Sequence, residues 1–164
     1  MEEKIKNLIR ILEKEADLYE QLLRFCKEEK TVIIKGDLKA LEKIVKKQED
    51  IFLQLQVWEK ARGLLMNSLK EILSLSKELT LSRLIKKVNR PFSSQLKKIQ
   101  KKIISLIKDI KETNKTNISL ITYSIKFVED CFNFLAGVEE VPVYTPEGKT
   151  DRKEQKRKLL DQRT

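Results

Sequence analysis

Apolar side chains recur every three or four residues over most of the chain, which predicts a protein built from long helices. Between residues 4 and 34 the intervals alternate between three and four, and two glutamates stand in the otherwise apolar row. The row is Ile5, Leu8, Leu12, Glu15, Tyr19, Leu22, Cys26, Glu29 and Ile33. A second row widens the apolar face beyond that of a two-stranded coiled coil: Ile9, Ala16 and Leu23. We therefore expect the first helix to lie in a bundle.

The stretch at residues 35–37 separates this helix from the next. Gly36 has no Cβ and can take the left-handed conformation that ends a helix. Asp37 can accept hydrogen bonds from the first free N–H groups of a following helix, and its charge suits the positive helix end. A connection this short reverses the chain, so the first two helices are expected to lie side by side and antiparallel.

The second helix is expected from residue 38 to about residue 76. It carries two apolar rows, which predict two partners and hence a position between the first helix and a third. Three polar residues interrupt these rows: Gln48, Glu59 and Arg62. They are candidates to bind polar groups of a neighbouring helix.

A short helix is expected over residues 81–88, followed by a third long helix from Pro91 to Ala136 with Gly137 closing it. Polar side chains fall on the apolar rows in the middle of this helix: Thr113, Asn114 and Asn117. Buried polar groups need hydrogen-bond partners, which the interrupting residues of the second helix could supply. Such a layer would fix the register between the helices.

The last part of the chain differs from the rest. The segment 141–148 is extended and turn-like, and residues 151–164 have mixed charge with little apolar surface. The sequence therefore predicts an all-α fold, an elongated antiparallel helical bundle or coiled coil of three long helices with a short connecting helix. The bundle is expected over residues 1–137, and a flexible, partner-binding tail over residues 138–164.

The composition contains no candidate for catalysis or metal binding. The chain has no histidine, two widely separated cysteines, and neither a GxSxG motif nor a glycine-rich phosphate loop. We expect no catalytic, cofactor or metal site, so an enzyme is not expected. The first residues lack the apolar core of a signal peptide, and no apolar run is long enough to span a bilayer. The expected location is the cytoplasm, without membrane insertion.

The formal charge of +10 is concentrated in one stretch. Residues 83–111 contain ten basic residues and one acidic residue, a net charge of +9. This stretch is either a solvated helix face or a surface for nucleic acid or an anionic membrane. The lysine-rich part of this stretch, residues 97–111, contains no aromatic residue for base stacking, so specific nucleic-acid binding is not expected.

Several segments, in their order along the chain, resemble FlgN-type flagellar export chaperones. They are Leu12–Leu23, the hinge Lys35–Leu41, Thr80–Ile85, the Asn114 and Asn117 pair, and the turn Tyr144–Gly148. The resemblance covers roughly residues 4–148 and implies a cytosolic type III secretion chaperone. It further implies binding to hook–filament junction proteins, protection of their terminal helices from premature association, and delivery to the export apparatus. The chain departs from the usual acidic character of secretion chaperones.

A chaperone for amphipathic helices needs an apolar surface and a segment that folds on contact. The end of the third helix and the tail supply apolar side chains for both. The expected partner-binding residues are Phe127, Phe132, Phe134, Val141, Val143, Tyr144, Leu159 and Leu160. The alternatives are a basic helical-bundle protein that binds nucleic acid or anionic membrane, and a structural coiled-coil adaptor.

Overall fold

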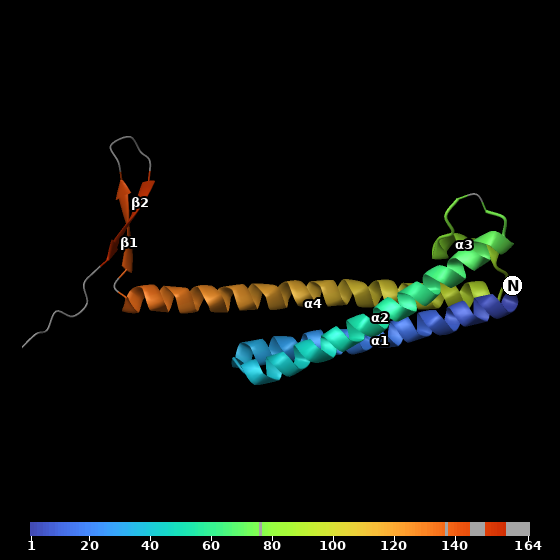
Figure 1. The fold of residues 1–164 in the computed structure, drawn as a ribbon, viewed down its shortest axis with the longest axis horizontal. Coiled ribbons are helices and arrows are strands. Elements are labelled where there is room, and N and C mark those ends of the chain that lie inside the picture. The colour runs from blue at the N-terminus through green and yellow to red at the C-terminus, as the bar shows by residue number, and fades with distance from the viewer. Residues whose placement is uncertain (76, 137, 145–149, 157–164) are drawn as a thin grey trace, which may run out of the picture. The chain divides into compact units, whose positions relative to one another are not determined.

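The computed structural model of the protein describes residues 1–75, 77–136, 138–144 and 150–156, the last two stretches as backbone only (Figure 1). Along these residues the elements follow in the order α1 (Glu2–Lys35), α2 (Leu38–Ile72), α3 (Leu81–Lys87), α4 (Phe92–Leu135), β1 (Val138–Tyr144) and β2 (Thr150–Lys156). The chain forms two compact units, Met1–Ile118 and Ser119–Thr164, and α4 contributes to both.

The predicted reversal at residues 35–37 is confirmed. Gly36 is left-handed, with φ +68°, and its N–H donates to the Ile33 carbonyl at 3.1 Å. The Asp37 carboxylate then accepts a hydrogen bond from the Ala40 N–H at 3.0 Å and caps the start of α2. As a result α1 and α2 lie side by side as an antiparallel hairpin (Figure 1).

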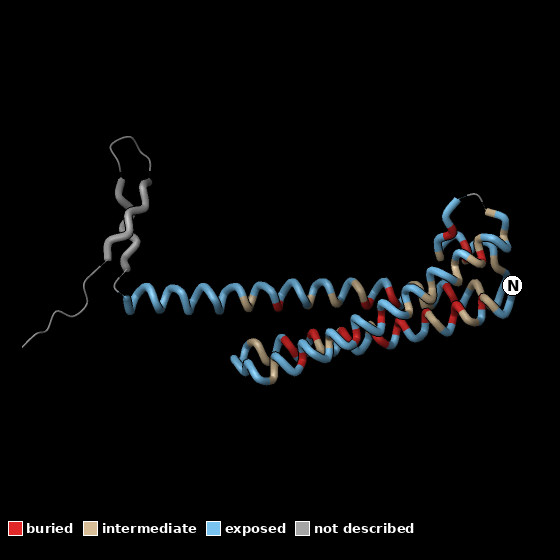
Figure 2. The backbone as a smooth tube through the Cα atoms, viewed as in Figure 1, coloured by how far each residue is buried: buried red, intermediate tan, exposed pale blue. Residues whose placement is uncertain are grey.

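The buried side chains of the helical unit are concentrated on α1. They occur along most of this helix: Ile5, Leu8, Ile9, Leu12, Glu15, Ala16, Leu18, Leu22, Cys26 and Glu29. On α2 they are fewer: Ile44, Ile51, Leu55 and Leu69. One apolar row of α2 is exposed in the first half of the helix, where 38% and 52% of the surface of Val45 and Phe52 is accessible, and is buried farther on at Leu55 and Leu69. The prediction that α2 is the middle helix is therefore wrong in its first half. Figure 2 shows buried and exposed positions along α1 and α2.

Two clusters of buried apolar side chains hold the helices together. The larger cluster joins all four helices: Ile5, Leu8, Ile9, Leu12, Ala16, Leu69, Leu79, Leu84, Leu96 and Ile103. The smaller cluster joins α1 and α2 with Ile110 of α4 packed against it: Leu18, Leu22, Cys26, Ile51 and Leu55. Because the first part of α4 reaches both clusters, this part belongs to the same core as the hairpin.

The short helix α3 is fixed by a cap and one buried side chain. The Thr80 hydroxyl accepts a hydrogen bond from the Arg83 N–H at 3.3 Å, which makes Thr80 the N-cap. Leu84 is 1% exposed and belongs to the larger cluster. The predicted connecting helix is therefore confirmed, and with it the all-α fold class of three long helices and one short helix.

The backbone after α4 forms an antiparallel pair of strands. Val138 of β1 is paired with Lys156 of β2, and the register continues to Tyr144 opposite Thr150. The sequence predicts an extended, turn-like segment here but not the pairing, and residues 145–149 lie outside the described residues. Valine and tyrosine are frequent in strands, which agrees with this conformation. The flexibility of residues 138–164 and the boundary after residue 137 stay predictions.

Two glycines provide a matched test of the reversal. Gly36→Ala should lower the free energy of unfolding by roughly 1 kcal/mol, because a Cβ strains the left-handed conformation. Gly63 lies inside α2 and a Cβ added there meets nothing within 4 Å. Gly63→Ala should therefore raise the free energy of unfolding by about 0.5–1 kcal/mol. Urea denaturation of both variants measures this, and equal shifts in the same direction would contradict the assigned role of Gly36.

Candidate functional site

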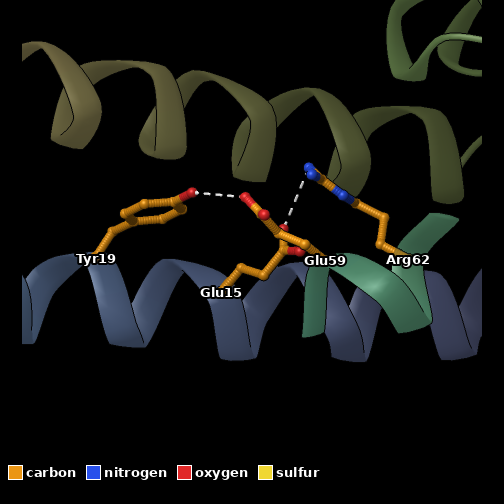
Figure 3. Close-up of polar contacts among 4 residues, drawn as sticks. All are labelled: Glu15, Tyr19, Glu59 and Arg62. Atoms are coloured by element: carbon orange, nitrogen blue, oxygen red, sulfur yellow. Dashed lines mark hydrogen bonds and ion pairs between the residues drawn. The ribbon is translucent and has the colours of Figure 1, made fainter. Parts of the chain in front are cut away.

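A first polar group, here called the Glu15 layer, links α1 to α2 (Figure 3). It consists of Glu15 and Tyr19 from α1 and Glu59 and Arg62 from α2. The Arg62 Nη1 lies 3.3 Å from Oε2 of Glu15, whose side chain is 1% exposed. The Tyr19 hydroxyl donates a hydrogen bond to Oε1 of Glu59 at 3.5 Å. The two polar residues of α2 thus pair with α1, and not with the polar residues of α4 as the sequence analysis allowed.

The electrostatics of the Glu15 layer are dominated by desolvation. Burial raises the pKa of Glu15 above its ordinary value, the positive charge of Arg62 opposes this, and the nearby Glu59 reinforces it. Burial also raises the pKa of Tyr19, and the Glu59 carboxylate adds to that shift. Neither oxygen of Glu15 accepts a hydrogen bond from the described residues. Among these residues, the ion pair with Arg62 is therefore what stabilises the charged form of Glu15.

A second polar group, the Glu29 layer, joins three helices. The side-chain amide of Asn117 on α4 donates to the Cys26 carbonyl at 2.8 Å and to Oε2 of Glu29 at 3.0 Å. The amide of Gln48 on α2 donates to the same Glu29 oxygen at 3.0 Å. A polar layer does form at Asn117, but its hydrogen-bond partners are groups of α1 and not the polar residues of α2 that the sequence suggested; Gln48 belongs to the layer only through the shared Glu29 acceptor.

The other two polar residues in the middle of α4 take no part in this layer. Thr113 donates its hydroxyl hydrogen to the Asp109 carbonyl of its own helix at 2.8 Å, and Asn114 is exposed. Asn117 is 1% exposed and marks the last buried position of α4. The Glu29 layer thus lies at the end of the buried part of this helix.

Beyond Asn117, α4 continues to Leu135 with apolar side chains that are exposed. One row of α4 has alternating spacings of three and four, from Leu96 through Asn117 to Phe134. Its early members Leu96, Ile103 and Leu106 are buried, whereas Phe127 and Phe134 are 69% and 83% exposed. Figure 2 shows the last part of α4 in pale blue, the colour of exposed residues. We call the exposed set the α4 apolar surface; it comprises Ile118, Tyr123, Ile125, Phe127, Val128, Phe132, Phe134 and Leu135.

Three of the residues predicted to bind a partner belong to this surface: Phe127, Phe132 and Phe134. Three more have their backbone in β1: Val141, Val143 and Tyr144. The last two, Leu159 and Leu160, lie outside the described residues. The predicted set lacks Tyr123, Ile125 and Val128, which are also exposed on this surface and to which the apolar spacing past Asn117 points.

The two cysteines have different surroundings. Cys26 is buried beside the Glu29 layer, where burial and the Glu29 charge raise the pKa of its thiol. Cys131 is exposed on α4, and both thiols are free.

The described stretches hold no group of three or more metal-ligating side chains, and none of their helices is both long and apolar enough to traverse a bilayer. The α4 apolar surface is therefore the leading candidate for function.

A helical core that leaves a long apolar helix face exposed is typical of proteins that bind other chains. Residues 1–152 match the model of the family described as FlgN protein, so the chain belongs to the FlgN family. Membership gives it the general role of a flagellar export chaperone. The resemblance noted in the sequence is thereby confirmed. Comparison with curated proteins and with solved structures gave no match.

Removing the Asn117 amide tests the Glu29 layer. Asn117→Ala should lower the free energy of unfolding by about 1–3 kcal/mol, because the buried Glu29 carboxylate loses one of its two donors. The control is Asn114→Ala, an exposed site on the same helix, which should change stability by no more than about 0.5 kcal/mol. Thermal or urea unfolding followed by circular dichroism gives both values, and equal losses would show that the layer contributes nothing.

Glu15 predicts a pH dependence of stability. Its folded pKa lies above the ordinary 4.5, so between these two values the folded state holds a proton that the unfolded state has released. The stability contributed by Glu15 is therefore present below pH 4.5 and is lost as the pH rises through the folded pKa. Glu15→Leu removes this loss, because leucine fits the apolar row and the partly exposed Arg62 can be hydrated.

We expect Glu15→Leu to be more stable than the parent chain at pH 7 by about 1 kcal/mol, with a smaller gain near pH 4.5. Glu13→Leu, at an exposed position of the same helix, serves as the control and should show no gain that grows with pH. Urea denaturation at several pH values measures the difference. A pH-independent difference for Glu15→Leu would contradict the assignment.

Proposed function

We propose that the chain is a cytoplasmic export chaperone whose clients are the hook–filament junction proteins of the flagellum. It binds their terminal helices, prevents their premature association and delivers them to the type III export apparatus without chemistry of its own. One observation supports this proposal above all. The heptad row of α4 is buried or half-buried as far as Leu120 and exposed from Ser124 to Phe134, although its spacing of three and four continues without a break.

An exposed row of this kind is suited to a helical partner. Apolar side chains spaced by three and four residues pack against the same spacing on another amphipathic helix. The three phenylalanines carry large apolar areas, and burying such a ring removes about 150–250 Å² from water. A client whose terminal helices are amphipathic supplies the missing apolar face, so each chain covers the surface that makes the other prone to aggregate.

The tail supplies a second apolar element in this proposal. Val141, Val143 and Tyr144 lie in β1, and the pair Leu159 and Leu160 follows near the C-terminus. We infer that this segment folds over the bound client helix and adds contact area. A flexible segment that orders on binding contributes specificity, although the ordering itself lowers the net affinity.

The apolar character of the surface favours helix capture over nucleic-acid binding. Nucleic-acid affinity comes mainly from phosphate contacts by lysine and arginine, with aromatic rings stacking on bases only in single-stranded sites. Lys126 is the single cation between Ile118 and Leu135. A purely structural adaptor would use the same apolar face, but it would not release its partner for export.

Two pairs of substitutions test the client surface. Phe127→Ser with Phe134→Ser should weaken binding to a purified hook–filament junction protein at least tenfold, about 1.4 kcal/mol. The control pair is Phe52→Ser with Leu64→Ser, which changes two exposed apolar residues of α2 and should leave affinity within about twofold. Isothermal titration calorimetry gives the affinities, and circular dichroism verifies that helical content is retained.

Deletion of residues 138–164 forms a third arm of this experiment. It should also weaken client binding at least tenfold while leaving the helical content intact. Full affinity of the double phenylalanine variant would show that the client binds elsewhere. If only the truncated chain keeps full affinity, the α4 apolar surface binds the client without help from the tail.

A further inference from the structure

One face of α4 carries a regular row of lysines that neither the core nor the client surface uses. Positions 97, 101, 104, 108 and 111 follow each other at alternating spacings of four and three, which places them on one side of the helix. The lysine row consists of Lys97, Lys101, Ile104, Lys108 and Lys111. All five are exposed, and Ile104 keeps 60% of its surface accessible.

The positive charge of the lysine row is largely uncompensated by the protein. Lys108 lies 3.8 Å from Glu112, a loose contact between exposed side chains. Lys97, Lys101 and Lys111 form no ion pair with any described residue. In contrast Lys102, outside the row, pairs with Glu20 of α1 at 3.0 Å. Like charges one helical turn apart repel each other, so the row destabilises the isolated helix slightly unless an external anion neutralises it.

We propose that the lysine row docks α4 on the surface of an anionic lipid bilayer. A single straight row on one helix can meet a plane with all of its members at once, over roughly 21 Å from position 97 to position 111. Anionic headgroups attract each lysine close to the surface, and these contributions add along the row. Ile104 stands in the middle of the row, where it can enter the boundary between headgroups and acyl chains.

The same features disfavour nucleic acid as the occupant. The row contains no aromatic ring for base stacking, and no arginine, asparagine or glutamine for reading base edges. An exposed isoleucine among lysines gains nothing from a phosphate backbone. The helix lies on the bilayer in this proposal, since no described helix is apolar enough to cross one.

The lysine row and the α4 apolar surface occupy different parts of the chain. The row ends at Lys111, whereas the apolar surface begins at Ile118. Membrane docking therefore does not depend on the proposed client binding, and either activity can fail without the other. A chaperone with both surfaces could carry its client while resting on the inner face of a membrane.

The test uses the full-length chain and lipid vesicles sedimented at about 150 mM salt. One vesicle preparation contains about 30% phosphatidylglycerol in phosphatidylcholine, and the other contains phosphatidylcholine alone. The row variant carries Lys→Gln at Lys97, Lys101, Lys108 and Lys111. The control carries Lys→Gln at four exposed lysines of the hairpin: Lys6, Lys14, Lys27 and Lys43. Both variants have lost four positive charges, so they differ only in where the charge was removed.

The parent chain should bind the anionic vesicles at least tenfold more tightly than the neutral ones. The row variant should lose about tenfold in affinity, and the control should stay within about threefold of the parent. If the parent chain shows no preference for anionic vesicles, the proposal is overturned, whatever the variants do. Equal losses in both variants overturn it too, because net charge alone would then explain binding. Tighter, row-dependent binding to DNA or RNA of any sequence at the same salt identifies nucleic acid as the occupant instead.

Discussion

The packing of the apolar row of α1 against its neighbours is the interaction on which the helical unit depends. Its members from Ile5 to Cys26 contribute to both buried clusters, so this one helix runs through the whole core that α2, α3 and the first part of α4 share. The reversal at Gly36 brings α2 back along α1, and the cap at Asp37 starts α2 in the right direction. The two buried carboxylates of α1 then form the polar contacts between helices.

In the proposed function a single helix, α4, serves both stability and binding, because its surroundings change along its length. Up to Asn117 its apolar row completes the core, and the amide of Asn117 ends that part with hydrogen bonds to α1. After this residue the same spacing continues without burial. An exposed apolar face therefore arises where the core ends and the amphipathic pattern continues, and the proposed binding requires no separate domain.

Local features of the fold were predictable from the sequence, whereas the choice of partners was not. Helix ends are determined at Gly36, Asp37 and Thr80 by the backbone and side chains of these residues themselves. The local sequence is therefore enough to predict these helix ends. The spacing of the apolar residues of α2 does not reveal which of them meet another helix. Phe52 is one that does not, and it is exposed. Likewise the apolar row of α4 was predictable from its spacing, but the pairing of Arg62 with Glu15 required coordinates.

The two glutamates of α1 have a consequence for how the helices find each other. A row of leucines and isoleucines with a period of seven has translational symmetry, so sliding one helix by a heptad costs little apolar contact. Glu15 and Glu29 are two heptads apart and break that symmetry. A slip of one heptad would move Glu15 to the place of Leu8 or Leu22, inside an apolar cluster and away from Arg62. The buried carboxylates thus penalise misaligned pairings more than they stabilise the correct one, and the native alignment is selected by exclusion.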